Sequence, residues 1–476
     1  MPRFDLSSRV EEIRSRWGVV GLAVGIVRDG GLESFHGAGL ADIATRTPVT
    51  ADTVFRIASI TKTFTGVAVM QLWERGLVDL DAPANEYLRA FRLVPADPSW
   101  RPATVRHLLT HTGGVPEIVR VSRVLHSGWF SESYGLDEPL PTLGEYYRGE
   151  LRLAAEPGTV FTYTDHGFAT LGQIVEDVSG QPLDDYLRQH VLHPLGMRDS
   201  DMTDTDRLAP RRATGYRITS KGPKALVDRS WITRAATELR CSTRDLARYV
   251  AALLQGGEGE HGTILKPKTI EQMFAPQYQP DPRIPGMGLA FWRADLGGRR
   301  TVEHQGVLPG FNSQIFLAPD DGVGVLALTN GAAAGLRWLA PWASGLLGEV
   351  IGAPPDTVRR GLAQHPEVWG EVCGRYRVRA QRTDMQARTM VGAGLIVGVR
   401  RGQLVIRALS PLPTLLRGFV LHPDDEHDPY VFRIDLTDLD LGTARIVFVP
   451  DGDVVHAHLE MPPLSLFCRR AQEVAA

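Results

Sequence analysis

The sequence predicts a protein of the α/β (α+β) class in two parts, a large block of mixed strands and helices and a small antiparallel β domain. In the first part, short apolar segments typical of strands stand on both sides of segments with helical periodicity. After about residue 366 the helical pattern stops, and short strand-like segments alternate with turns. A chain of 476 residues is long enough for two or three domains of ordinary size.

The first part begins with a predicted helix over residues 1–18, and the stretch GVVGLAVGIVRDGG that follows is β-rich and ends in a Gly-Gly turn. A helix is predicted from Thr61 to Arg75, with Gly76 as its C-terminal stop. Further helices are expected at 171–180, 183–192, 242–257 and 338–352, and further strands at 301–306, 313–319 and 322–330.

The second part is expected to be a separate domain. We predict a first domain over residues 1–355, a linker over 356–365 and a β domain over 366–476. Its strand-like segments are 394–409, 430–436, 444–460 and 464–470, with turns at Arg401-Gly402 and Asp451-Gly452.

Composition excludes several classes of partner. The net charge is −3, so no nucleic-acid surface or polybasic membrane segment is expected. No run of about 18 apolar residues occurs, which argues against a membrane span. The start of the chain lacks the apolar segment of a signal peptide. The three cysteines, Cys241, Cys373 and Cys468, form no C-x-x-C pair or disulfide framework, so a cytoplasmic location is predicted. The oligomeric state stays open.

One lysine stands out in a chain that otherwise uses arginine. Of the 52 basic residues only five are lysines, and one of these, Lys62, lies three positions after Ser59 at the start of a predicted helix. Residues i and i+3 share one helix face, so both side chains can meet in one site. Lysine can lose its proton in a protein, whereas arginine cannot. A serine nucleophile needs a base nearby, and Lys62 is therefore a candidate partner of Ser59.

Three further stretches supply candidate site residues: RHLLTHTGG, from Arg106; EPGTVFTYTDHGFATLG, with Tyr163 and Asp165; and EHQGVLPGFNS, with His304 and Gly306. In this order with Ser-x-x-Lys, they resemble the class C β-lactamase-like serine hydrolases. The resemblance covers roughly residues 7–350. It implies an antiparallel sheet flanked by helices, a helical region beside it, and, more weakly, a barrel-like C-terminal domain.

The resemblance assigns a role to each matching residue. It implies that Ser59 is the acylated nucleophile and Lys62 its partner one helical turn on. It implies that Tyr163 is the tyrosine of a Tyr-x-Asn motif. His304 and Gly306 match the family's third element, which is Lys-Thr-Gly in lactamases and often His-x-Gly in esterases and peptidases. The backbone N–H groups of Ser59 and Val307 are the implied oxyanion hole, which stabilises a tetrahedral intermediate.

The identity of the base stays open at this stage. A protonated Lys62 would favour the Tyr163 phenolate, whereas a neutral Lys62 would itself take the serine proton, and coupled groups titrate as a unit. Two residues depart from the lactamase pattern. Asp165 replaces the family asparagine, and an ionised aspartate only accepts hydrogen bonds. His304 replaces the lysine that meets a β-lactam carboxylate.

The predicted function is a serine hydrolase that cleaves an ester, amide or short-peptide bond through a Ser59 acyl-enzyme. An esterase or a D-amino-acid peptidase or amidase is favoured over an efficient β-lactamase. The alternatives are an acyltransferase on the same scaffold and a catalytically weak protein that binds peptidoglycan peptides or β-lactams. No cofactor or metal is expected, because His107 and His111 are spaced i, i+4 but lack the glutamate of a zinc-protease helix.

Overall fold

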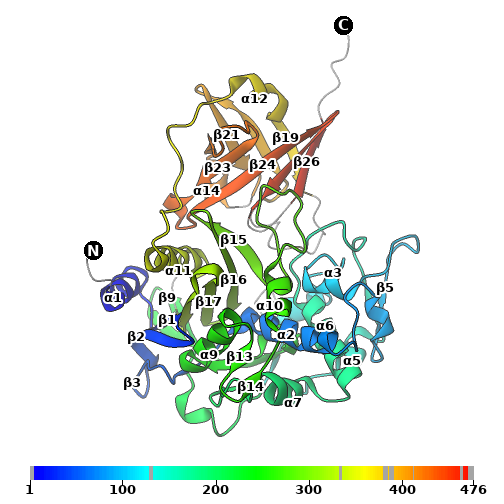
Figure 1. The fold of residues 1–476 in the computed structure, drawn as a ribbon, viewed down its shortest axis with the longest axis vertical. Coiled ribbons are helices and arrows are strands. Elements are labelled where there is room, and N and C mark those ends of the chain that lie inside the picture. Colours follow the sequence, from blue (N-terminus) through cyan, green and yellow to red (C-terminus); the bar gives the residue numbers. More distant parts are fainter. Residues whose placement is uncertain are drawn as a thin grey trace.

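The computed structural model describes residues 5–127, 132–331, 335–378, 384, 391–410, 412–460 and 465–469. Within these ranges, seven antiparallel strands form the central sheet, in the order β15-β16-β17-β18-β1-β2-β3. The strands are β1 (Gly21–Arg28), β2 (Gly31–Asp42), β3 (Thr47–Pro48), β15 (Trp292–Leu296), β16 (Arg299–Leu308), β17 (Phe311–Ala318) and β18 (Val323–Thr329). Figure 1 shows this sheet below the C-terminal domain. The first and last parts of the large block therefore share one sheet.

Both faces of the sheet are covered, which explains why β1 is apolar along nearly its whole length. On one face, α1 (Leu6–Trp17) and α11 (Gly335–Ile351) pack over β2, β17 and β18, and Leu22 and Val24 point into this core. On the other face, α9 (Thr243–Leu254) packs over β1 and β18, and Ala23 and Val27 belong to the second core. The alternation of side chains along the strand separates the two cores.

A helical region lies on the α9 side of the sheet, at the right in Figure 1. Its central helix, α2 (Thr61–Glu74), is buried along almost its entire length and packs against α6 (Asp165–Ser179) and α8 (Arg234–Thr237). The remaining helices of this part are α3 (Val105–Leu109), α4 (Val121–Ser127), α5 (Leu143–Tyr147), α7 (Leu183–Leu187) and α10 (Pro267–Phe274). Its short strands are β4 (Val54–Arg56), β5 (Arg92–Val94), β6 (Ser133–Gly135), β7 (Glu150–Arg152), β8 (Ser200–Asp201), β9 (Tyr216–Thr219), β10 (Gly222–Ala225), β11 (Arg229–Trp231), β12 (Arg240–Ser242), β13 (Glu258–Gly259) and β14 (Gly262–Thr263).

The C-terminal part is a closed antiparallel barrel of eight strands in the described residues, β19 to β26 in sequence order. They are β19 (Gly374–Val378), β20 (Leu395–Arg400), β21 (Gln403–Ala408), β22 (Phe419–Pro423), β23 (Val431–Asp435), β24 (Thr443–Asp451), β25 (Val454–Leu459) and β26 (Ser465–Arg469). Two short helices, α12 (Pro366–Val372) and α14 (Pro413–Leu416), accompany them. The barrel interior is filled by its own apolar core. Closure pairs every strand with two neighbours, which leaves no open sheet edge.

A loop of the large block, residues 275–291, lies against the barrel, and we call it the barrel-facing loop (Figure 1); Arg16 of α1 makes a second contact, an ion pair with Asp440 at 2.7 Å. Ile284 of this loop is buried against Val431 and Val447 on the barrel. Beside it, Arg283 forms an ion pair with Asp428 at 2.7 Å. The loop is therefore fixed by an apolar contact and a charged one.

The predicted fold class is confirmed, including the barrel-like C-terminal domain. The helix predicted from Thr61 ends at Glu74, and the Gly76 that follows has a φ of +69°. The turn predicted at Arg401-Gly402 is present between β20 and β21, and the turn between β24 and β25 lies one residue later than predicted, at Gly452-Asp453. Many elements were not predicted. They include the first turn and a half of α6, whose N-cap is Thr164, strands β2 and β15 of the central sheet, most of the short helices and strands of the helical region, and strands β19 and β22 of the barrel. Within the described part of the chain, no helix has the length and apolar character needed to cross a membrane.

Candidate active site

Ser59 lies where a short 3-10 turn, η1 (Ala58–Ile60), runs directly into α2. Ala58 adopts a left-handed backbone conformation with a φ of +53°, which is uncommon for a residue with a side chain. Such conformations cost free energy and persist only when the surrounding packing imposes them. Ser59 keeps 9% of its surface exposed although the rest of the turn is buried. The strained turn therefore presents the serine at the edge of a buried helix.

Lys62 is fully buried one turn along α2, and its ammonium is surrounded by oxygen atoms. Nζ lies 2.9 Å from Ser59 Oγ, 2.6 Å from Asp165 Oδ1 and 3.3 Å from the Ala236 carbonyl oxygen. Burial disfavours the ammonium, but Asp165 and Tyr163 outweigh this effect and hold the pKa of Lys62 above its ordinary value. The resting lysine is therefore charged at neutral pH.

Tyr163 and Asp165 flank Thr164, the residue that caps the N-terminus of α6. The cap places the Asp165 carboxylate at the first position of the helix, where the positive end of the helix dipole favours a negative charge. The Tyr163 ring lies beside Lys62, with Nζ 4.7 Å from its centroid. Burial raises the pKa of Tyr163 above its ordinary value, and the charge of Lys62 offsets part of that rise.

Strand β16 carries His304, Gly306 and Val307 past the serine turn. A Cβ at Gly306 would overlap the Ile57 carbonyl oxygen and the Ser313 hydroxyl. Glycine is therefore required at this position, because the strand lies directly against the turn that precedes Ser59. This close approach brings Val307 to the same edge of the sheet as the serine.

Two buried histidines lie near Tyr163. The His111 ring centroid is 4.4 Å from that of Tyr163, and the His304 centroid is 6.4 Å from it. Burial, together with the charge of Lys62, lowers the pKa of His304 to about 3 and that of His111 well below its ordinary value. Both rings are therefore neutral at physiological pH.

The tautomer of each histidine follows from its bonded nitrogen. His304 Nδ1 lies 2.8 Å from the Gln305 carbonyl oxygen, which can only accept, so His304 Nε2 carries a lone pair. The backbone N–H of Thr164 donates to His111 Nδ1 at 3.2 Å, so His111 Nε2 carries the proton. Neither Nε2 atom has a hydrogen-bond partner among the described residues.

The residues predicted from the sequence lie together around the N-terminal end of α2. They are Ser59, Lys62, Tyr163, Asp165, His304, Gly306 and Val307. The sequence predicted a place in the site for neither His111 nor Trp292, although the Trp292 ring stacks on Tyr163 with the ring centroids 5.9 Å apart. The stretch RHLLTHTGG was the available signal for His111, whereas nothing in the sequence marks Trp292. Among the described residues, no group of three or more His, Cys, Asp or Glu side chains is arranged to hold a metal ion.

Comparison with known proteins places this site in a family. The sequence model of the β-lactamase family matches residues 6–347, nearly three quarters of the chain. The protein therefore belongs to the β-lactamase family, a family of serine hydrolases with esterase and peptidase members.

Individual relatives are distant. The chain is 27% identical over 369 residues to penicillin-binding protein 4 of Amycolatopsis lactamdurans, covering 74% of this chain and 93% of the relative. It is 35% identical over 188 residues to the esterase EstB of Burkholderia gladioli, covering 38% of this chain and 46% of the relative. An octameric penicillin-binding protein homologue from Pyrococcus abyssi is similar in fold over 98% of this chain and 100% of its own, with a TM-score of 0.62 at 24% identity. That similarity spans the barrel as well as the large block.

Proposed function

We propose that the protein is a serine hydrolase that cleaves an ester or amide bond through an acyl-enzyme on Ser59. The observation that carries the proposal is the buried Lys62 ammonium, which contacts Ser59 Oγ at 2.9 Å and Asp165 at 2.6 Å. A buried charge is costly unless it is paired, and catalytic sites are where such groups gather. A lysine kept only for packing would not need to end within hydrogen-bond distance of an accessible serine.

The proposed proton path starts from a charged Lys62 and a neutral Tyr163. Tyr163 first gives its phenol proton to solvent, and the adjacent ammonium stabilises the resulting phenolate. As Ser59 attacks the carbonyl carbon, this phenolate takes the serine proton. Throughout, the Lys62 ammonium has two side-chain oxygen partners, Asp165 and Ser59. In this scheme Asp165 keeps the lysine charged, and the leaving group receives the proton from Tyr163.

The developing oxyanion is assigned to the backbone N–H groups of Ser59 and Val307. Donors of this kind typically lower the barrier by about 3–4 kcal/mol each. The close contact of Gly306 with the serine turn supports the assignment, because it fixes the strand that carries Val307 against the residue before Ser59. The Nε2 lone pair of His304 remains available to accept a hydrogen bond from Tyr163 or from a bound substrate.

The proposed substrates are esters, or amides and peptides of D-amino acids, rather than β-lactams. His304 is neutral and buried, so it offers no positive charge to a β-lactam carboxylate. Asp165 is committed to Lys62 and cannot donate to a substrate carbonyl. The names of two relatives, an esterase and a D-aminopeptidase, agree with this choice.

The test is covalent labelling followed by turnover. A fluorophosphonate probe should add one label to the protein by intact mass and none to Ser59→Ala. A panel of short-chain p-nitrophenyl esters, D-aminoacyl amides and a chromogenic lactam should then give turnover with esters or amides. Labelling that persists in Ser59→Ala would refute the nucleophile. Faster product release on addition of an amine or alcohol acceptor would favour an acyltransferase, and labelling without turnover on any substrate would favour a binding protein.

A further inference from the structure

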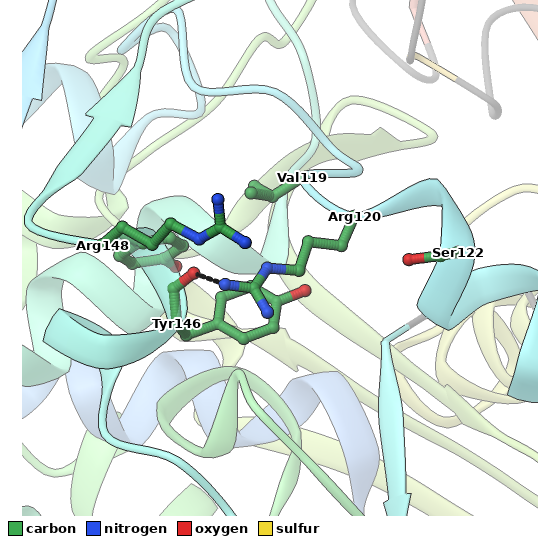
Figure 2. Close-up of a pocket in the computed structure, with 6 residues that line it drawn as sticks. Val119, Arg120, Ser122, Tyr146 and Arg148 are labelled. Atoms are coloured by element: carbon green, nitrogen blue, oxygen red, sulfur yellow. Dashed lines mark hydrogen bonds between the residues drawn. The ribbon is translucent and has the colours of Figure 1, made fainter.

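A cavity outside the serine site brings two arginines together. It has a volume of about 430 Å³ and is lined by Val119, Arg120, Ser122, Tyr146, Tyr147 and Arg148. Figure 2 shows the guanidinium groups of Arg120 and Arg148 pointing toward one another over the ring of Tyr146. Arg120 comes from the segment before α4, and Arg148 from the residue after α5. Two segments separated in sequence therefore contribute one cation each.

Neither guanidinium has a carboxylate partner among the residues that the structure describes. Arg120 donates to the backbone carbonyl oxygen of Tyr146, and its guanidinium carbon lies 4.3 Å from the centroid of the Tyr146 ring. Arg148 has no side-chain hydrogen bond or ion pair within the described ranges. Arg148 is exposed to solvent at the cavity, so most of the ten N–H donors of the pair have no protein acceptor among the described residues.

The nearest buried carboxylate does not neutralise the pair. Glu132 accepts hydrogen bonds from the Arg120 backbone N–H, from the Tyr146 hydroxyl at 2.6 Å and from His166 Nε2. Its two oxygens are thus occupied behind the wall of the cavity. Two like charges held face to face repel one another unless an anion lies between them. Guanidinium groups match carboxylate and phosphate oxygens in geometry as well as in charge.

The wall of the cavity is connected to the serine site. The Tyr147 hydroxyl and His166 Nδ1 are 2.7 Å apart, and His166 directly follows Asp165. On the other side, the Thr164 hydroxyl donates at 2.8 Å to the carbonyl oxygen of Pro116, four residues before Arg120. Both edges of the cavity are therefore attached to the segment that carries Tyr163 and Asp165. A group bound beside Tyr147 would therefore contact a residue that is hydrogen-bonded to the segment carrying Tyr163 and Asp165.

We propose that Arg120 and Arg148 form an oxyanion subsite that binds a carboxylate or a phosphate group. The group belongs either to the substrate, distal to the bond that is cleaved, or to a separate small anion. The first source rests on the proposed hydrolase function, whereas the second does not. The chemistry of recognition is the same in both cases: two guanidinium forks close on one planar or tetrahedral anion above an aromatic floor.

The binding test uses succinate and inorganic phosphate as probes, at constant ionic strength, with isothermal titration calorimetry on the full-length protein. Arg148→Gln should weaken binding at least tenfold, with unchanged thermal unfolding. Arg46→Gln is the matched control, because Arg46 is also an exposed arginine with a left-handed backbone and no ion pair among the described residues. This control should bind like the unmodified protein. Absence of binding up to about 10 mM of either probe, or equal weakening by both variants, would overturn the proposal.

Kinetics distinguish the two sources of the anion. If the substrate carries the anion, Arg148→Gln should raise KM about tenfold for the p-nitrophenyl monoester of succinate without changing kcat. The kinetic constants for the p-nitrophenyl butyrate ester should stay the same. If a separate anion binds, phosphate should change KM for the butyrate ester, and Arg148→Gln should abolish that effect. Should the protein hydrolyse neither ester, the calorimetric comparison still decides the subsite, so the two proposals fail independently.

Discussion

Lys62 and Asp165 form an ion pair of 2.6 Å at the junction of two helices, with the lysine fully buried and 26% of the aspartate side chain exposed. The pair joins the N-terminal turn of α6 to the first turn of α2. The same ammonium also contacts Ser59 Oγ at 2.9 Å. Asp165, which stands where the resembling family has asparagine, is therefore the counter-ion of Lys62. The charge state of the site depends on this one carboxylate.

Lys62→Arg is expected to lose about 10²–10⁴-fold in kcat/KM, because Tyr163 then loses the ammonium that supports it as the base, and general acid–base assistance usually contributes this much. A guanidinium keeps the charge, but its larger planar fork does not reproduce the three contacts of Nζ at this fully buried position. Turnover of a p-nitrophenyl ester, with circular dichroism to verify folding, is the measurement. Near-normal activity would contradict the prediction and mean that any positive charge at position 62 is sufficient, whatever its contacts.

Asp165→Asn is expected to shift the alkaline limb of kcat/KM to lower pH. Asp165 raises the pKa of Lys62, so its removal lets burial lower that pKa. The lysine then loses its proton at a lower pH. Lys62→Arg should show no such limb, because guanidinium does not titrate in this range. An unmoved limb in Asp165→Asn would assign the limb to a group other than Lys62.

The same variant should reduce stability. Because the pKa of Lys62 is raised on folding, the pair stabilises the protein at pH values below the unfolded pKa, and this contribution is lost as the pH rises through the folded pKa. Breaking a buried pair typically costs about 3–5 kcal/mol, and the partial exposure of Asp165 reduces this to about 1–3 kcal/mol. Urea unfolding at pH 7 measures the loss. Equal stability of both proteins would show that the ion pair contributes to chemistry alone.

Glu303→Gln is expected to stabilise the protein above pH 7. Glu303 is buried in β16 with Gln314 as its side-chain partner, and burial raises its pKa to about 7. The folded state then holds a proton that the unfolded state has lost, so stability falls between about pH 4.5 and 7. The glutamine side chain does not titrate, so the variant avoids this loss, which amounts to about 3 kcal/mol in the free energy of unfolding at pH 8. Thermal unfolding at pH 5 and pH 8 should show the gain only at pH 8; a gain of equal size at both values would contradict the assigned titration.

A chain that ends at Gly361 is expected to fold but to turn over substrate more slowly. Removal of the barrel exposes Ile284 and leaves Arg283 without Asp428, so the barrel-facing loop loses its support. Met287 and Tyr278 of this loop pack with Phe161 and Tyr163 at the serine site. The measurement compares thermal unfolding and kcat for the truncated chain with Asp428→Asn, which keeps the barrel. Loss of all folded structure on truncation would place the domain boundary elsewhere.

Much of the fold class and part of the candidate active site were predictable from local sequence. Ser59 and Lys62 lie three residues apart on one helix, so their proximity follows from helical geometry alone. The barrel hairpins were predictable because a Gly turn between two apolar runs is a local signal. Strands β19 and β22 were missed because their apolar residues become recognisable only as part of a closed barrel.

The tertiary structure alone decided the contacts between distant segments. Asp165 pairs with Lys62 across 103 residues, and Gly306 lies against a turn almost 250 residues earlier. No short-range preference encodes such distances, because they result from how α2, α6 and β16 pack. The charge states follow the same logic, since the neutral His304 and the protonated Lys62 reflect burial and a neighbouring charge. The sequence by itself therefore determined which groups are available for chemistry, and the packing of the elements decided how those groups are paired and charged.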